Sequence, residues 1–189
     1  AGLNSFGNTI IDEKISSRDH TENLLINNSR AIKIKKGRKK TIKIVGKKEL
    51  DKINIKISGD PSSAAFFTAL TLLNQISYLK IKNVGLNPSR IGFYKILKKY
   101  KAKIKFKNLK KKNNEISGDI IVQSCRLRPL KTPAHLYPST TDEYLLLFLI
   151  ASFQNGVSTF KGISDLANKE SSRAFQMKKI LGQIGIKCT

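Results

Sequence analysis

The chain has 189 residues, of which 40% are hydrophobic, enough for one ordinary core or for parts of two. Its 36 Lys and Arg outnumber its 13 Asp and Glu to give a net charge of +23, which raises the question of nucleic-acid binding. Its two distant cysteines, Cys125 and Cys188, argue against a disulfide framework or a Cys-x-x-Cys zinc site, and its longest apolar run, residues 145–151, is far below the roughly 20 residues of a membrane span. We therefore expect a soluble, cytoplasmic protein.

The lysines follow a pattern that indicates strands rather than a nucleic-acid platform. They alternate with isoleucine at residues 32–35 and 42–44, which is typical of strands with one buried and one solvated face. No aromatic and basic platform of the RNA-recognition type accompanies them. Most of the charge is therefore interpreted as solvated surface, and a basic nucleic-acid-binding module remains as the alternative from a different functional class.

Three segments of the chain share one order of elements: a helix end, a turn, a short strand, a loop with an arginine, and a further helix. The first has a helix end at residues 1–3, a strand near 7–11, Arg18, and a helix over 20–28. The second has a helix over 61–73, a strand over 78–82, Arg90, and a helix to 99. The third has a helix over 141–153, a strand over 158–162, Arg173, and a helix to 181. The chain is thus predicted to consist of repeating units.

Local signals support these elements. Asp60-Pro61 and Asn87-Pro88 each place an N-cap acceptor before a proline at the first helical position, and capping-box spacing recurs at residues 19–22 and 140–143. Alternating segments predict strands at 31–35, 41–45, 53–57, 102–106 and 119–123, and residues 107–114 are predicted to be a basic loop at a hairpin tip. The result is an α/β chain of β-α-β-α-β-β units.

Two helix starts could address an anion or a proton. Ser17 and Arg18 precede the helix start at 20, where a hydroxyl and a guanidinium suit a phosphate or carboxylate, with a plain helix cap as the alternative. Asp142 precedes a strongly apolar helix, so its carboxylate lies near a core edge where a hydroxyl could be oriented or deprotonated. The alternative for Asp142 is simple complementation of the helix dipole.

A third helix start carries two cations and an acid. Lys169 and Arg173 lie four residues apart and would share a helix face, so that both could hold one anion while Glu170 points elsewhere. The alternative is ordinary ion pairing at the surface.

Five motifs follow one another along the chain. They are Asn-Thr-Ile-Ile-Asp-Glu with Ser-Arg-Asp-His-Thr-Glu (8–13 and 17–22), Gly-Asp-Pro-Ser-Ser-Ala-Ala-Phe-Phe (59–67), Val-Gly-Leu-Asn-Pro-Ser-Arg (84–90), Asp-Glu-Tyr (142–144) and Lys-Glu-Ser-Ser-Arg (169–173). In this order they resemble the motifs of the 3-phosphoshikimate 1-carboxyvinyltransferase (EPSP synthase) family of enolpyruvyl transferases. The resemblance covers nearly the whole chain.

The resemblance implies two domains of β-α-β-α-β-β units about a pseudo-threefold axis, the inverse α/β barrel type, with substrates in the cleft between them. Residues 1–58 would be the C-terminal part of the first domain and residues 59–189 the N-terminal two-thirds of the second. The implied reaction transfers enolpyruvyl from phosphoenolpyruvate to the 5-hydroxyl of shikimate 3-phosphate and releases phosphate. No metal or organic cofactor and no nucleic-acid or membrane partner is implied, and we expect a monomer when the chain is full length.

The resemblance also assigns roles to the candidate residues. Ser17 and Arg18 would contact the shikimate phosphate, and Asp142 would hold or deprotonate the attacking hydroxyl. The remaining three residues come from the last motif. Lys169 would neutralise substrate charge, and Glu170 would move the proton at the phosphoenolpyruvate methylene. Arg173 would bind the carboxylate or phosphate of that substrate.

The chain departs from the family pattern in several places. Residues 167–173 read Ala-Asn-Lys-Glu-Ser-Ser-Arg where the family commonly has Arg-Val-Lys-Glu-Ser-Asp-Arg, and Leu145 replaces a proline. The early lysine-serine-arginine, Ser-Ala-Gln and Asn-Asp-His-Arg motifs and the late lysine are absent from these 189 residues. We therefore interpret the chain as an internal fragment that is inactive alone.

The nearest alternative is the sister enzyme that transfers enolpyruvate to UDP-N-acetylglucosamine, which shares the fold and the first substrate. Its reactive cysteine loop has no counterpart in this chain, and the motif at 17–22 favours the shikimate enzyme.

Overall fold

The computed structural model describes residues 1–167 and 172–189, and the chain divides into two compact units. Unit 1 comprises Ala1–Ile57 and Lys110–Ile116, and unit 2 comprises Ser58–Leu109 and Ser117–Thr189. The assignment of 1–58 and 59–189 to parts of two particular domains of the family's fold stays a prediction.

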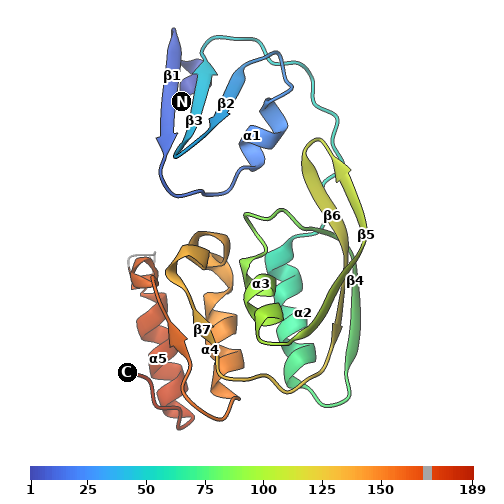
Figure 1. Cartoon of the computed structure of the whole chain (residues 1–189), viewed down its shortest axis with the longest axis vertical. Helices are drawn as coiled ribbons and strands as arrows, with labels where there is room; N and C mark the ends of the chain where they lie inside the picture. Colours follow the sequence, from blue (N-terminus) through green and yellow to red (C-terminus); the bar gives the residue numbers. More distant parts are fainter. Residues whose placement is uncertain (168–171) are drawn as a thin grey trace. The chain divides into compact units, whose positions relative to one another are not determined.

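Unit 1 is a small antiparallel sheet with one helix packed against it (Figure 1). Its elements are η1 (Gly2–Asn4), β1 (Asn8–Glu13), α1 (His20–Leu25), β2 (Ile32–Lys36) and β3 (Lys40–Val45), and the strand order is β1-β3-β2. The core consists of Leu25, Ile32 and Ile42. Because side chains alternate across a strand, the intervening Lys33 and Lys43 face outward and lie opposite each other in the register.

Two predictions for unit 1 are wrong, and each has a local cause. The helix predicted over 20–28 ends at Leu25, because Ser29 and Arg30 adopt positive φ angles of 48° and 53° that no α-helix continues through. The segment 53–57, predicted as a strand from its alternation, is irregular and exposed. An alternating segment becomes a strand only by pairing with another, and the chain just before it is bonded through the Asp51 backbone to the Asn28 side chain instead.

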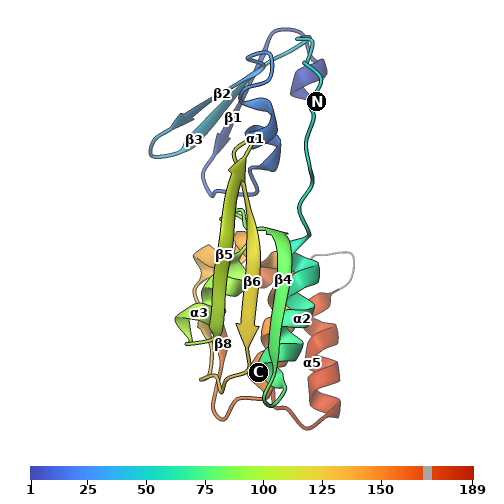
Figure 2. The same ribbon diagram turned by 90° about the vertical axis from the view of Figure 1, so that its right-hand side faces the viewer.

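Unit 2 contains a three-stranded sheet, a two-stranded sheet and the longer helices. The first elements are α2 (Pro61–Leu73), β4 (Tyr78–Gly85), α3 (Gly92–Lys99), β5 (Lys103–Lys112) and β6 (Glu115–Gln123), and the tip of the β5–β6 hairpin belongs to unit 1. The later elements are β7 (Lys131–Thr132), η2 (Ala134–Ser139), η3 (Thr141–Glu143), α4 (Tyr144–Ser152), β8 (Thr159–Phe160), η4 (Ser164–Ala167) and α5 (Arg173–Gln183). Figure 2 shows β5, β6 and β4 side by side, and α2 packs against both β4 and α4.

The repeating units predicted from the sequence share their topology. The first strand of each sheet pairs with the third, so the order β1-β3-β2 recurs as β4-β6-β5. A parallel link spans the helix that precedes each later unit: Gly59 bridges to Val84 across α2, and β7 pairs with β8 across α4. The order α2-β4-α3 then recurs as α4-β8-α5. The mixed α/β fold of β-α-β-α-β-β units is therefore confirmed.

The hairpin between β5 and β6 is longer than expected. Residues 107–112, predicted as loop, continue β5, and only the two residues Asn113 and Asn114 turn the chain. Their φ angles of 50° and 62° are those of a type I′ turn, which asparagine tolerates better than most residues. The tight turn extends the pairing, so the basic residues project from a strand rather than from a loop.

The predicted helix caps have mixed outcomes. Asp60 caps α2 as expected, because its Oδ2 accepts a hydrogen bond from the Ser63 backbone N–H at 2.7 Å and Pro61 occupies the first helical position. Asn87 caps no helix, since α3 begins at Gly92 and the Asn87 side chain instead accepts the Ser89 N–H in a local turn. The helix predicted from 141 begins as the 3₁₀ turn η3 and becomes α-helical at Tyr144.

Candidate functional site

The start of α4 carries an ion pair between two of the repeats. Asp142 lies in η3, and its Oδ2 accepts a hydrogen bond from Nη1 of Arg90 at 2.9 Å. The side chain of Asp142 is 38% exposed, whereas that of Arg90 is 12% exposed. A guanidinium donates hydrogen bonds in fixed directions and accepts none, so a largely buried one orients the carboxylate oxygen that it contacts.

Two further groups fix the same guanidinium. Its Nη2 donates to Oδ1 of Asp60 at 3.2 Å and to the Ser62 hydroxyl at 2.8 Å, and that hydroxyl donates in turn to the buried carboxylate of Glu143. Two carboxylates thus contact one guanidinium directly and a third is linked to it through Ser62, in a chain whose net charge is strongly positive. Burial opposes ionisation of Asp60, but hydrogen bonds from the helix start at Ser63 and Ser62 and the nearby Arg90 hold its pKa below the ordinary value.

The loop before α3 delivers Arg90 to this position. Asn87 Oδ1 accepts from both the N–H and the hydroxyl of Ser89, and the Arg90 N–H donates to the Asn87 carbonyl at 2.9 Å. Two residues later, Gly92 lies against the chain that leads to Asp142, because a Cβ at Gly92 would overlap atoms of Ser139 and Thr140. A glycine is therefore needed for the two segments to approach this closely.

The remaining site residues predicted in unit 2 come from the motif before α5. Arg173 is the first residue of α5 and is partly buried. Lys169 and Glu170, together with the common helix face predicted for Lys169 and Arg173, lie outside the described residues. Just before the motif, the Tyr137 hydroxyl donates to Asp165 at 2.8 Å, and burial together with this carboxylate raises the pKa of Tyr137 to about 12.

Unit 1 holds the other predicted pair, and here the side chains are engaged by the protein. The Ser17 N–H donates to Oε1 of Glu13 at 2.9 Å, and the Ser17 hydroxyl donates to the same oxygen. Arg18, the next residue, is exposed. An anion that used the Ser17 hydroxyl would therefore compete with Glu13 for it.

Beneath this loop lies a partly buried ion network. Nζ of Lys40 lies 2.6 Å from Oε2 of Glu13 and 2.8 Å from Oε1 of Glu22. Burial works against all these charges, yet the paired carboxylates raise the pKa of Lys40, and the bonds from Lys40 and Ser17 lower the pKa of Glu13. Glu22 is buried against Lys40, so this acid of the Ser-Arg-Asp-His-Thr-Glu motif has a structural partner.

The start of α1 is also bonded to the hairpin tip within unit 1. Oε1 of Glu115 lies 2.9 Å from Nδ1 of His20 and accepts from Nδ2 of Asn23, also at 2.9 Å. One carboxylate thus contacts two residues on the same face of the helix start that follows Arg18. Sequence reasoning missed this contact, because the partners are more than 90 residues apart.

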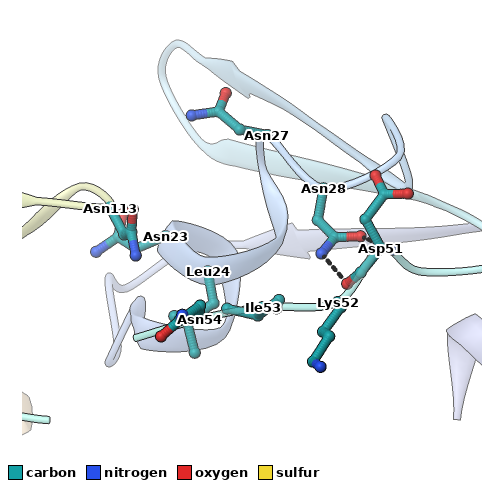
Figure 3. A pocket seen from close by; sticks show the side chains of 9 residues that line it. All are labelled: Asn23, Leu24, Asn27, Asn28, Asp51, Lys52, Ile53, Asn54 and Asn113. Carbon is teal, nitrogen blue, oxygen red and sulfur yellow. Dashed lines mark hydrogen bonds between the residues drawn. The ribbon is translucent and has the colours of Figure 1, made fainter. Parts of the chain in front are cut away.

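A polar surface pocket of about 240 Å³ lies on the same unit, on the side of α1 that meets the segment 51–54 (Figure 3). It is lined by Asn23, Leu24, Asn27, Asn28, Asp51, Lys52, Ile53, Asn54 and Asn113. The Asn28 side chain donates to the Asp51 carbonyl and accepts the Asp51 N–H, both at 2.8 Å. Neither Ser17 nor Arg18 is among the lining residues, so the pocket is separate from the predicted phosphate contacts.

Within the described part of the chain, no three His, Cys, Asp or Glu side chains are grouped so as to hold a metal ion. Among the same residues, no helix combines the length and apolarity that a membrane crossing requires.

Sequence reasoning used Arg90 only as a marker of the repeat and did not consider Asp60, Ser62 or Glu143 as part of the site. A signal was present, because Arg90 occupies the same place in its repeat as Arg18 and Arg173, two arginines that were already candidates. Its partner Asp142 could not be identified without the tertiary structure.

The profile of the family described as EPSP synthase (3-phosphoshikimate 1-carboxyvinyltransferase) matches residues 1–189. The chain belongs to the EPSP synthase family. It is similar to the 3-phosphoshikimate 1-carboxyvinyltransferases of Paramagnetospirillum magneticum, with 36% identity over 98% of this chain and 42% of the relative, and of Aquifex aeolicus, with 36% identity over 98% of this chain and 44% of the relative. The solved EPSP synthase from Acinetobacter baumannii superposes with a TM-score of 0.85 at 33% identity, covering all of this chain and 42% of that one.

The chain thus spans about two fifths of the length of the EPSP synthases that it matches. The five motifs that suggested the family lie at 8–22, 59–67, 84–90, 142–144 and 169–173, within the matched range.

Proposed function

We propose that this chain carries part of the active site of a 3-phosphoshikimate 1-carboxyvinyltransferase, which transfers enolpyruvyl from phosphoenolpyruvate to the 5-hydroxyl of shikimate 3-phosphate. The arrangement at the start of α4 supports the proposal most directly. There the predicted base Asp142 is paired with the largely buried guanidinium of Arg90, which orients its carboxylate for a role in accepting a hydroxyl proton.

The two units would contribute different parts of the reaction. In unit 1, Ser17 and Arg18 would contact the phosphate of shikimate 3-phosphate, the hydroxyl by exchanging its bond to Glu13. In unit 2, Asp142 would serve the acceptor hydroxyl. The motif before α5 would serve phosphoenolpyruvate, with Lys169 and Arg173 as the cations and Glu170 as the proton carrier.

The chemistry balances with these groups. The 5-hydroxyl oxygen attacks C2 of phosphoenolpyruvate, its proton passes to Asp142, and the C3 methylene gains a proton from Glu170 to give a tetrahedral intermediate. The methyl group then returns a proton to Glu170 as the bond from C2 to the phosphate oxygen breaks. The leaving phosphate takes the proton held by Asp142, which restores the base. The products are the enolpyruvyl ether and inorganic phosphate.

A chimera tests the proposal. These 189 residues replace the matching stretch of the Aquifex aeolicus relative, and phosphate release from phosphoenolpyruvate and shikimate 3-phosphate is measured. We expect turnover by the chimera and its loss with Glu170→Gln, because a general acid or base contributes about 10²- to 10⁴-fold. A folded chimera with no activity would contradict the proposal.

Two control measurements accompany the phosphate-release assay. The 189-residue chain alone is expected to show no turnover, since a single oriented donor is worth about 3–4 kcal/mol of transition-state stabilisation and several are contributed by motifs outside it. Replacing shikimate 3-phosphate with UDP-N-acetylglucosamine is expected to abolish phosphate release from the chimera. Turnover with the nucleotide sugar would favour the sister enzyme instead.

We further propose a cytoplasmic location and a monomeric full-length enzyme. Cys125 and Cys188 are both free thiols, which suits a reducing compartment. Size-exclusion chromatography with light scattering on the active chimera tests the monomer, and a stable dimer would contradict it.

A further inference from the structure

Arg90 is fixed by its surroundings more tightly than a surface ion pair requires. Its backbone is held by the turn at Asn87, and its guanidinium donates to Asp142, Asp60 and Ser62. With a side chain only 12% exposed, Arg90 has little freedom to leave this geometry. An exposed ion pair, in contrast, contributes little and reorients readily.

The partners of Arg90 form two groups. Asp60 and Ser62 belong to the start of α2 and hold Nη2, whereas Asp142 belongs to the start of α4 and accepts from Nη1. Two different nitrogen atoms therefore connect two helix starts, which requires the planar fork of a guanidinium. A lysine could supply the charge but not both directions at once.

We infer that Arg90 is the positioning residue of Asp142, because its fork ties the Asp142 carboxylate to the start of α2 and thereby sets where that carboxylate meets the acceptor hydroxyl. This inference rests on the proposed function, in which Asp142 takes the hydroxyl proton. Arg90 itself touches no substrate in this scheme. It acts through Asp142 alone, which distinguishes it from the arginines proposed to bind the substrates.

The charged groups around the Arg90–Asp142 pair determine how the loss of Arg90 would affect Asp142. Asp60, the N-cap of α2, accepts from the same guanidinium, and Glu143 of η3 accepts from the Ser62 hydroxyl that this guanidinium also reaches. The neutral Tyr94 of α3, whose pKa is raised by burial, donates to the Pro61 carbonyl. Without Arg90, Asp142 would lose the cation that it shares with Asp60, while the carboxylate of Glu143 remains next to it in the chain. Like charges and the loss of a cation both favour the protonated acid.

The test uses the chimera described above with four changes: R90Q, R90K, D142N and R126Q. For R90Q we expect kcat to fall about 100-fold, the loss that a misplacement of about 1 Å produces, with the KM for phosphoenolpyruvate nearly unchanged. The acidic limb of the kcat profile should move upward by about one pH unit, because Arg90 favours the ionised form. R126Q, at an exposed arginine of the same unit, should change neither quantity.

The R90K variant keeps the positive charge next to Asp142 but loses the guanidinium geometry that positions the carboxylate. It should keep the acidic limb near its original pH and still lose kcat, since the ammonium cannot bridge both helix starts. If R90Q does not fold by circular dichroism and thermal unfolding, R90K carries the test, and an unchanged kcat for R90K would overturn the inference.

A double variant tests whether the two residues act as one. R90Q added to D142N should cost nothing further, because a positioning residue has no effect once its carboxylate is gone. An additive loss, or an unmoved acidic limb in R90Q, would show that Arg90 acts otherwise. If D142N alone keeps full activity, the proposed role of Asp142 fails. If D142N is inactive while R90Q is unaffected, only the inference on Arg90 fails.

Discussion

The Nη1 atom of Arg90 lies 2.9 Å from Oδ2 of Asp142, although 52 positions separate the two residues in the chain. One belongs to the loop after β4 and the other to the turn before α4, so the contact joins successive repeats of the fold. The contact therefore depends on how one repeat packs against the next. The candidate site in unit 2 is built from that packing rather than from one contiguous motif.

Asp60 is expected to stabilise unit 2 both as a helix cap and as a charge. Asp60→Ala should lower the free energy of unfolding by about 1 kcal/mol through the lost cap alone. Because the pKa of Asp60 is depressed in the folded state, the charge contribution is complete above its ordinary pKa of 3.8 and is lost as the pH falls below it. Asp60→Asn is the matched control, since asparagine caps equally well but does not titrate. Urea unfolding of both variants at pH 7 and pH 3 separates the contribution of the helix cap from that of the charge.

Lys40 is expected to be a strong stabilising charge in unit 1. Lys40→Met would leave Glu13 and the buried Glu22 without their shared cation, and removal of one member of a buried ion pair typically costs about 3 kcal/mol or more. Lys39→Met is the control, because Lys39 and Asp12 form a solvent-exposed pair and such pairs contribute little to stability. Equal losses of unfolding free energy in the two variants would contradict the prediction.

The hairpin tip is expected to depend on Glu115 for its contact with α1. Glu115→Ala removes the acceptor shared by His20 and Asn23, so amide hydrogen exchange over residues 110–116 should become faster. Lys111→Ala, an exposed change on the same tip, should leave these rates nearly unchanged. Unaltered exchange in Glu115→Ala would show that the strand pairing alone holds the tip.

Helix α2 is expected to make the 189-residue chain self-associate. Its Phe66, Phe67 and Leu70 are 63%, 59% and 63% exposed, which is a contiguous apolar surface of the kind that drives association. Phe67→Gln should therefore lower the sedimentation-average mass without lowering stability. Phe93→Gln, a change at a fully buried ring, should instead unfold unit 2. If Phe67→Gln leaves self-association unchanged, the surface that drives it does not include this part of α2.

The lysines on the strands are expected to bind DNA weakly and without sequence preference. Lys103, Lys105 and Lys107 are exposed along β5, so phosphate contacts at low salt follow from charge alone. With three phosphate contacts, binding of duplex DNA should weaken about 40-fold between 50 and 200 mM salt. Tight, sequence-selective binding retained at 200 mM salt would support the nucleic-acid alternative.

Much of the local structure could be predicted from the sequence, because its cause is local. The alternation of lysine and isoleucine predicted β2 and β3, and Asp60 with Pro61 predicted the start of α2, whose observed bounds are those expected. These signals depend on side-chain alternation and on backbone groups within one helical turn, so neighbouring residues contain the necessary information. The order of motifs likewise sufficed to suggest the family.

Other features were decided only by the tertiary structure. Segment 53–57 has the alternation of a strand but pairs with no strand in the described part of the chain, and β5 extends to Lys112 because β6 pairs with it. The contact between Arg90 and Asp142 depends on the packing of two repeats. The contact between Glu115 and His20 depends on a hairpin tip whose partner lies 95 positions earlier in the chain. A hydrogen bond forms when two groups meet in space, and sequence spacing specifies that meeting only within a single helix, strand or turn.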